Sequence, residues 1–144
     1  MRIKGSVALV TGANRGIGKA FAQALLDHGA AKVYAGARDV TTITDPRLTP
    51  IQLDVTDPAS IARAAEVATD VTILVNNAGI GTAESLLGSE DNLRDTFEVN
   101  FFGLVAVTKA FEPVLKAIRA KPVLTPRNLQ RMPHHVESTV DVEA

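Results

Sequence analysis

Short apolar runs alternate with stretches of helical periodicity along the first 120 residues of the chain. Four of these runs have the length and composition typical of strands in a buried parallel sheet. The predicted strands are Val7–Val10, Lys32–Ala35, Ile51–Leu53 and Val71–Val75. Because helical segments separate them, the alternation predicts an α/β fold in which right-handed crossovers place helices on both faces of the sheet.

Two helices carry clear end signals. The helical pattern over Gly16–His28 is followed by Gly29, which can take the left-handed conformation that often ends a helix. A second helix is predicted after Asp57, since an aspartate N-cap followed by Pro58 is a common way to begin one.

A long helix is predicted from about Asp91, and Pro113 is expected to bend it. Its main apolar stripe contains Leu93, Phe97, Phe101, Leu104, Phe111, Leu115 and Ile118. Phe102, Val105 and Ala106 add apolar surface outside that stripe, so both faces of the helix expect burial. Self-association through this helix is therefore predicted.

Composition narrows the classes of function. The chain has 144 residues, which suggests one domain, and 46% hydrophobic against 22% charged residues is an ordinary globular balance. The net charge of −1 argues against a nucleic-acid or membrane-surface role based on bulk charge. No cysteine is present, which excludes disulfides and thiolate chemistry. Without a signal-like or membrane-spanning apolar run, a soluble cytoplasmic protein is expected.

The chain changes character near Lys121. All ten glycines lie between Gly5 and Gly103, whereas three of the seven prolines lie in the last 23 residues. We therefore expect a folded unit over residues 1–120 and an irregular, disordered tail over residues 121–144. His134 and His135 in that tail are neighbours that would not face the same way, so no metal site is predicted.

The junction between the first strand and first helix reads Thr11-Gly12-Ala13-Asn14-Arg15-Gly16-Ile17-Gly18. Glycines allow a tight turn and close approach of a phosphate, and the following helix offers free N–H groups to an anion. A Walker A loop is excluded, because Ala13 and Ala20 stand where glycine and Ser or Thr are required. The remaining alternatives are a nucleotide-binding loop and a glycine-rich turn that only allows close packing.

Arg38 follows the second predicted strand, 20 residues after Gly18. In dinucleotide-binding folds an acid near this place bonds the ribose of NAD, while an arginine suits the 2′-phosphate of NADP. Together with Arg15 in the glycine loop, Arg38 favours NADP over NAD. The alternative is that Arg38 is a solvated charge balanced by Asp39.

Four motifs together resemble the short-chain dehydrogenase/reductase family, classical type. They are Thr11-Gly-x-x-x-Gly16-Ile17-Gly18, Asp54-Val55-Thr56, Asn76-Asn77-Ala78-Gly79 and Glu98-Val99-Asn100. The resemblance covers roughly Lys4 to Ala120. It implies a partial Rossmann fold, with a parallel sheet of about four strands in the order 3-2-1-4 and flanking helices, from a C-terminally truncated family member. In such a sheet the fourth strand would lie at an apolar edge, the kind that pairs with other chains, so self-association through this strand is also predicted.

The resemblance also implies roles for individual residues. Gly12, Gly16, Ile17 and Gly18 would cradle the pyrophosphate, and Asn14 and Arg15 would line the adenosine phosphate side. Asp54 would contact the adenine amino group, Val55 would bound the ring, and Asn77, Ala78 and Gly79 would pass beside the ribose. Asn100 would be the one member of the family's catalytic tetrad that is present. Two structural alternatives stay open: Asp54 could cap a turn with Thr56, and the paired asparagines could join strand ends.

The family's proton-transfer residues have no counterpart in these 144 residues. No Tyr-x-x-x-Lys occurs, and the only tyrosine, Tyr34, lies in the second predicted strand with Arg38 four residues later, in the coenzyme region. No serine follows a fifth strand, and Ser138 lies in the irregular tail. Three hypotheses follow: an NAD(P)-dependent oxidoreductase that obtains its proton donor elsewhere, a non-catalytic NADP-binding module, and an unstable remnant of a disrupted gene.

Overall fold

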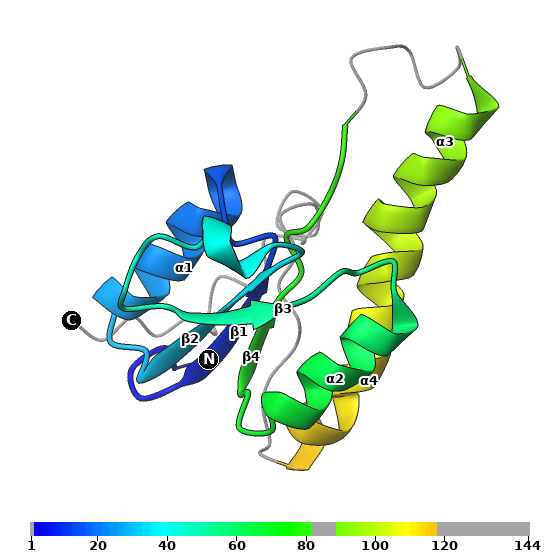
Figure 1. Ribbon diagram of the computed structural model, residues 1–144. Coiled ribbons are helices and arrows are strands. Elements are labelled where there is room, and N and C mark those ends of the chain that lie inside the picture. Colours follow the sequence, from blue (N-terminus) through cyan, green and yellow to red (C-terminus); the bar gives the residue numbers. More distant parts are fainter. Residues whose placement is uncertain (1, 82–88, 118–144) are drawn as a thin grey trace, which may run out of the picture.

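The computed structural model describes residues 2–81 and 89–117, which form a four-stranded sheet with helices on both faces (Figure 1). The strands are β1 (Val7–Thr11), β2 (Lys32–Ala37), β3 (Thr49–Gln52) and β4 (Ile73–Val75). The helices are α1 (Gly16–Asp27), α2 (Pro58–Val67), α3 (Glu90–Phe97) and α4 (Leu104–Ala117), with a 3₁₀ turn η1 (Val40–Thr42) and a π-helical segment η2 (Glu98–Gly103).

The strand order is β3-β2-β1-β4 and every pairing is parallel, as expected. β1 lies at the centre, where Val10 pairs with Ala35 of β2 on one side and with Val75 of β4 on the other. β3 lies at an edge, which explains how it accommodates Pro50, a residue without an N–H to donate. The predicted fold class and strand order are therefore confirmed.

Alternate residues of β1 point into two separate cores, because successive side chains of a strand face opposite sides of a sheet. Ala8 and Val10 pack with Leu25 of α1 on one face. Leu9 packs with Phe111 of α4 and with α2 on the other face. Figure 1 shows these two layers, with α1 on one side of the sheet and α2 and α4 on the other.

The predicted helix ends are present. Gly29 has φ +88°, and the N–H groups of Gly29 and Ala30 donate to the carbonyls of Leu26 and Leu25 in the pattern that closes a helix with a left-handed residue. Asp57 caps α2, its carboxylate accepting a 2.9 Å hydrogen bond from the N–H of Ala59. These local signals were sufficient because each acts within one turn of chain.

The long predicted helix differs from expectation in its buried face. Phe97 and Phe101 are about half exposed, at 49% and 54%, although they belong to the predicted stripe. The π-helical η2 inserts a wider turn between α3 and α4, so a stripe drawn at a constant 3.6-residue period loses phase there. Beyond η2 the buried residues are Val107, Phe111 and Leu115. α3 also extends past the sheet (Figure 1).

Pro113 lies inside α4, which remains helical to Ala117. Ile118 and the predicted tail over residues 121–144, with Ser138, His134 and His135, lie outside the described residues. None of the helices within residues 2–81 and 89–117 has the length and apolar character that a membrane span requires.

Candidate coenzyme site

A cavity of about 760 Å³ opens at the carboxyl ends of the strands. In the strand order β3-β2-β1-β4, the chain runs outward from β1 to β2 and β3 and then returns to the other side of β1 to form β4. The cavity lies at this switch point, where open α/β sheets bind ligands. Every residue expected from the sequence to bind coenzyme lines this cavity, namely Gly12, Asn14, Arg15, Gly16, Ile17, Gly18, Arg38, Asp54, Val55, Asn77, Ala78 and Gly79. The volume suits a small-molecule site.

The turn from β1 into α1 requires its glycines. Gly12 and Gly16 have φ values of +66° and +54°, in the left-handed region that favours glycine. Gly18 has an ordinary φ, but a Cβ there would lie far inside contact distance of the Gly12 carbonyl oxygen and the Asn77 side chain. Around Gly16 nothing lies within 4 Å of the position of a Cβ, so this side of the loop is open to a ligand.

The N-terminus of α1 faces the cavity without a side-chain cap. Arg15 occupies the N-cap position, makes no capping hydrogen bond, and the first turn contains no acidic residue. The leading N–H groups of a helix have no partner within the helix, and the helix dipole favours negative charge there. This end of α1 therefore suits an anion such as a phosphate.

A buried threonine joins the glycine loop to the end of β4. The Thr11 hydroxyl accepts hydrogen bonds of 2.9 Å from the N–H groups of both Asn77 and Ala78. In return, the Asn77 amide donates to the carbonyls of Thr11 at 3.0 Å and Gly12 at 3.3 Å. The structural role considered for Asn77 is thus present, and it fixes the two loops that form the cavity floor.

Asp54 closes a turn at the cavity wall. One carboxylate oxygen accepts from the Thr56 N–H at 2.9 Å and from the Thr56 hydroxyl at 2.8 Å. The backbone hydrogen bond from Thr56 lowers the pKa of Asp54, and the hydroxyl of Thr56 and the charge of Arg38 act in the same direction. Asp54 is therefore ionised, and its second oxygen receives no hydrogen bond from the described residues.

Asp39 does not neutralise Arg38. Its carboxylate accepts from the Thr41 hydroxyl at 2.6 Å and the Thr41 N–H at 2.9 Å, and the hydroxyl bond in particular lowers the pKa of Asp39. Within residues 2–81 and 89–117, neither Arg38 nor Arg15 forms an ion pair. Two guanidinium groups therefore line the cavity without a carboxylate bound to either of them.

Asn100 holds the loop after β4 rather than lining the cavity. Its amide pairs with the backbone of Ile80 in both directions: Oδ1 accepts from the N–H and Nδ2 donates to the carbonyl, each at 2.8 Å. Asn100 lies in the π-helical η2, and π-helical turns frequently accompany functional sites. Both polar atoms of the Asn100 side chain are therefore bound to the backbone of Ile80.

Sequence reasoning missed several lining residues and misplaced the tyrosine. Ala37, Asp39, Leu53, Thr56, Ile80 and Val99 also line the cavity. Thr56 and Val99 belong to recognised motifs but were given no role, and the other four residues are sequence neighbours of predicted site residues, which is the signal that could have found them. Tyr34 belongs to the core on the α2 and α4 face, where its hydroxyl donates to Asp70 before β4, so the tyrosine is not part of the coenzyme region with Arg38.

The described residues contain no group of three or more His, Asp or Glu side chains placed to hold a metal ion. The charged residues that line the cavity are Arg15, Arg38, Asp39 and Asp54.

The chain is similar in sequence and in fold to known proteins. Residues 6–122 match the family model described as short chain dehydrogenase. The 3-oxoacyl-[acyl-carrier-protein] reductase FabG of Salmonella typhimurium is 35% identical, over 87% of this chain and 55% of the relative. A short chain dehydrogenase from Burkholderia cenocepacia, solved in complex with NADP, is 41% identical with a TM-score of 0.81, covering 87% of this chain and 54% of that one.

A 3-ketoacyl-(acyl-carrier-protein) reductase from Brucella melitensis, solved with NADH, is 29% identical with a TM-score of 0.75, covering 85% of this chain and 57% of that one. The chain thus spans about half the length of these relatives.

Proposed function

This chain belongs to the short chain dehydrogenase family, and from that premise we propose that its cavity binds NADP, with NAD the weaker ligand. One observation carries the proposal: Arg15 and Arg38 line one cavity beside the uncapped N-terminus of α1, and neither is paired with a carboxylate of the described residues. Two unpaired guanidinium groups and the positive end of a helix dipole at one cavity suit a ligand with more than one phosphate.

The chain offers distinct groups to each part of the coenzyme. The N–H groups at the start of α1 would hold the pyrophosphate, and Gly16 leaves the space that close approach requires. The ionised Asp54 would accept from the adenine amino group through the oxygen that Thr56 does not use, while Val55 would bound the ring. Arg38 and Arg15 would bind the 2′-phosphate, which NAD lacks.

Relatives with each coenzyme are known, since the Burkholderia structure contains NADP and the Brucella structure contains NADH. The preference for NADP therefore rests on this chain's own arginines. Asp39, the acid that would otherwise suit a free ribose hydroxyl, is already bound to Thr41.

We further propose that the protein takes part in oxidoreductase chemistry of the carbonyl and alcohol type, in the cytoplasm. Bound NADPH would supply the hydride. The residues described here bind and orient the coenzyme, and the serine, tyrosine and lysine of the family's site have no counterpart in these 144 residues. The unit over residues 1–120 would act alone only as a coenzyme-binding module, the second function that this sequence supports.

Titration of NADPH with the chain tests the binding proposal directly. Tryptophan is absent, so the reduced coenzyme can be followed by fluorescence without competing indole emission. Arg38→Ala should weaken NADPH binding about tenfold and leave NADH binding nearly unchanged, because only the former loses a charge-assisted phosphate contact. Arg63→Ala is the matched control, since Arg63 is an exposed arginine of α2 whose guanidinium lies 3.7 Å from Asp57. Absence of binding at high micromolar protein would contradict the proposal.

We also propose that the chain self-associates through an aromatic surface made of Phe97, Phe101 and Phe102. These side chains are 49–54% exposed, and the rings of Phe101 and Phe102 pack edge to face at 5.2 Å. Such a cluster is costly to leave in water. Phe101→Glu should lower the apparent mass in light scattering, whereas Val67→Glu, a lone exposed residue of α2, should not. A monodisperse wild-type monomer at micromolar concentration would refute this proposal.

A further inference from the structure

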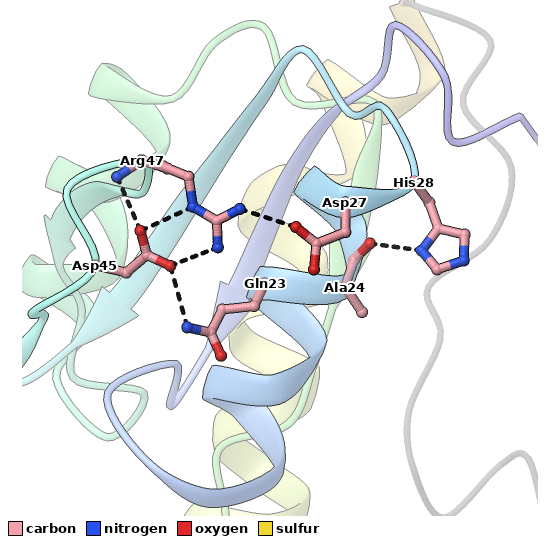
Figure 2. A network of polar contacts seen from close by, with 6 residues as sticks. All are labelled: Gln23, Ala24, Asp27, His28, Asp45 and Arg47. Atoms are coloured by element: carbon pink, nitrogen blue, oxygen red, sulfur yellow. Dashed lines mark hydrogen bonds and ion pairs between the residues drawn. The ribbon is translucent and has the colours of Figure 1, made fainter.

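A row of polar side chains along α1 holds the loop between β2 and β3. Lys19, Gln23 and Asp27 succeed one another at four-residue intervals and therefore share one face of the helix. They contact Thr44, Asp45 and Arg47 in the same order: Lys19 Nζ to Thr44 Oγ1 at 3.5 Å, Gln23 Nε2 to Asp45 Oδ2 at 3.1 Å, and Arg47 to Asp27 at 2.8 Å. Figure 2 shows the last two contacts.

At the centre of this row, Arg47 and Asp45 form a bidentate ion pair. Arg47 donates from Nε to one oxygen of Asp45 at 3.1 Å and from Nη2 to the other at 2.8 Å, and its backbone N–H also donates to Asp45 at 3.0 Å (Figure 2). The hydrogen bonds from Arg47 hold the pKa of Asp45 far below its usual range. The Asp45 side chain is only 9% exposed, whereas Arg47 is half exposed at 52%, so the pair is shielded on its carboxylate side and held there by three hydrogen bonds.

We call Gln23, Asp27, Asp45 and Arg47 the clamp. The clamp joins α1 to the loop between β2 and β3. The two arginines of the cavity lie at the beginnings of these two segments. Arg15 is the residue immediately before α1. Arg38 begins the clamped loop, directly after β2. Leu48 of the loop also packs in the core on the α1 face, so the loop has an apolar attachment as well as a polar one.

We infer that the clamp is a positioning device for coenzyme selection: by fixing the β2–β3 loop against α1, it sets the separation of Arg15 and Arg38 to suit one phosphate between them. This inference rests on the proposed NADP binding. A phosphate held by two guanidinium groups is sensitive to their spacing, because charge-assisted hydrogen bonds need donor–acceptor distances near 2.8 Å. A ligand without that phosphate gains little from the same spacing.

Because Asp45 is negatively charged, its removal distinguishes a positioning role of the clamp from a general electrostatic effect on ligand binding. Asp45→Ala removes a negative charge, which by Coulomb attraction alone would strengthen the binding of an anion. Loss of the clamp would instead let Arg38 move relative to Arg15 and weaken phosphate binding. The two explanations therefore predict opposite results for one substitution.

Calorimetric titration of the 144-residue chain with adenosine 2′,5′-bisphosphate and with ADP tests the inference. The readout is the ratio of the two dissociation constants, which isolates the 2′-phosphate from the rest of the ligand. Asp45→Ala should reduce the preference for the bisphosphate about fivefold, somewhat less than Arg38→Ala, which removes a phosphate ligand outright. Gln23→Ala, which removes one clamp hydrogen bond and no charge, should reduce it about twofold.

Asp70→Ala is the matched control. Asp70 is likewise an aspartate bound to a basic side chain, Lys32, and to one other polar group, but it lies before β4, at the opposite end of the sheet from the cavity. It should lower stability and leave the preference unchanged. An unchanged or increased preference in Asp45→Ala would overturn the inference, and if that variant does not fold, an unchanged preference in Gln23→Ala would do so. Failure of the proposed function would be distinct, because the wild-type chain itself would then show no preference.

Discussion

Thr11 is the position at which one hydroxyl group joins the two loops of the coenzyme site. Its side chain is 1% exposed, and its oxygen accepts from the N–H groups of Asn77 and Ala78, each at 2.9 Å. Thr11→Val replaces the hydroxyl with a methyl group of similar size, so the packing of β1 is retained while both N–H groups lose their acceptor. The substitution therefore tests the hydrogen bonds with little change of shape.

The expected magnitude follows from the two orphaned donors. A buried polar group left without a partner costs about 1–3 kcal/mol, so two cost about 2–6 kcal/mol. Burial of the added methyl group returns about 1 kcal/mol. We expect a net loss of about 3 kcal/mol in the free energy of unfolding, equivalent to a fall in melting temperature of roughly 10 °C for a chain of this size.

Urea unfolding followed by circular dichroism measures this loss, with Thr11→Ser as the matched variant. Serine keeps the hydroxyl and removes a buried methyl group, so it should cost about 1 kcal/mol. Coenzyme binding should weaken in Thr11→Val and not in Thr11→Ser, because only valine releases the end of β4. If Thr11→Val were as stable as Thr11→Ser, the hydroxyl would not be the bond that holds the two loops, and the reasoning would be refuted.

Three further predictions concern packing and pH. Gly18→Ala should destabilise the fold by about 1–3 kcal/mol and weaken NADPH binding, since its Cβ would overlap the Gly12 carbonyl, whereas Gly81→Ala, with nothing within 4 Å, should be close to neutral by thermal denaturation. Phe111→Ala should cost about 3–5 kcal/mol in urea, because the ring is fully buried between α4 and the sheet; a cost under 1 kcal/mol would contradict that packing. Although partial burial acts to raise it, the pKa of Asp70 is lowered by its hydrogen bonds with Lys32 and Tyr34, so its contribution to stability is present above its usual value of 3.8 and is lost as the pH falls through the folded-state pKa. Asp70→Asn should therefore make the free energy of unfolding fall less steeply below about pH 4. If the pH dependence of the free energy of unfolding were the same in the variant and the wild type, the ion pair between Asp70 and Lys32 would not contribute to stability.

The sequence alone predicted the local structure correctly wherever the interactions that determine it lie within a few residues of each other. Gly29 and Asp57 act within a single helical turn, and both form the predicted helix ends. The glycine loop is similar: Gly12 and Gly16 are needed for their own backbone angles, which depend little on the rest of the fold. The alternation of strands and helices also determined the parallel sheet, because a parallel connection requires a crossover.

The tertiary structure decided what depends on residues distant in sequence. Thr11 belongs to the glycine-loop motif, but the motif does not reveal what its side chain does, which appears only when the end of β4, more than 60 residues later, meets it. The π-helical segment around Asn100 interrupts the regular period of the long helix, and Asn100 within it is bound to Ile80, a residue 20 positions earlier. The clamp between Asp45, Arg47 and α1 likewise joins residues about 20 apart. Local backbone preference can be predicted from sequence, whereas partners chosen by folding cannot, since their energies exist only once the distant elements meet.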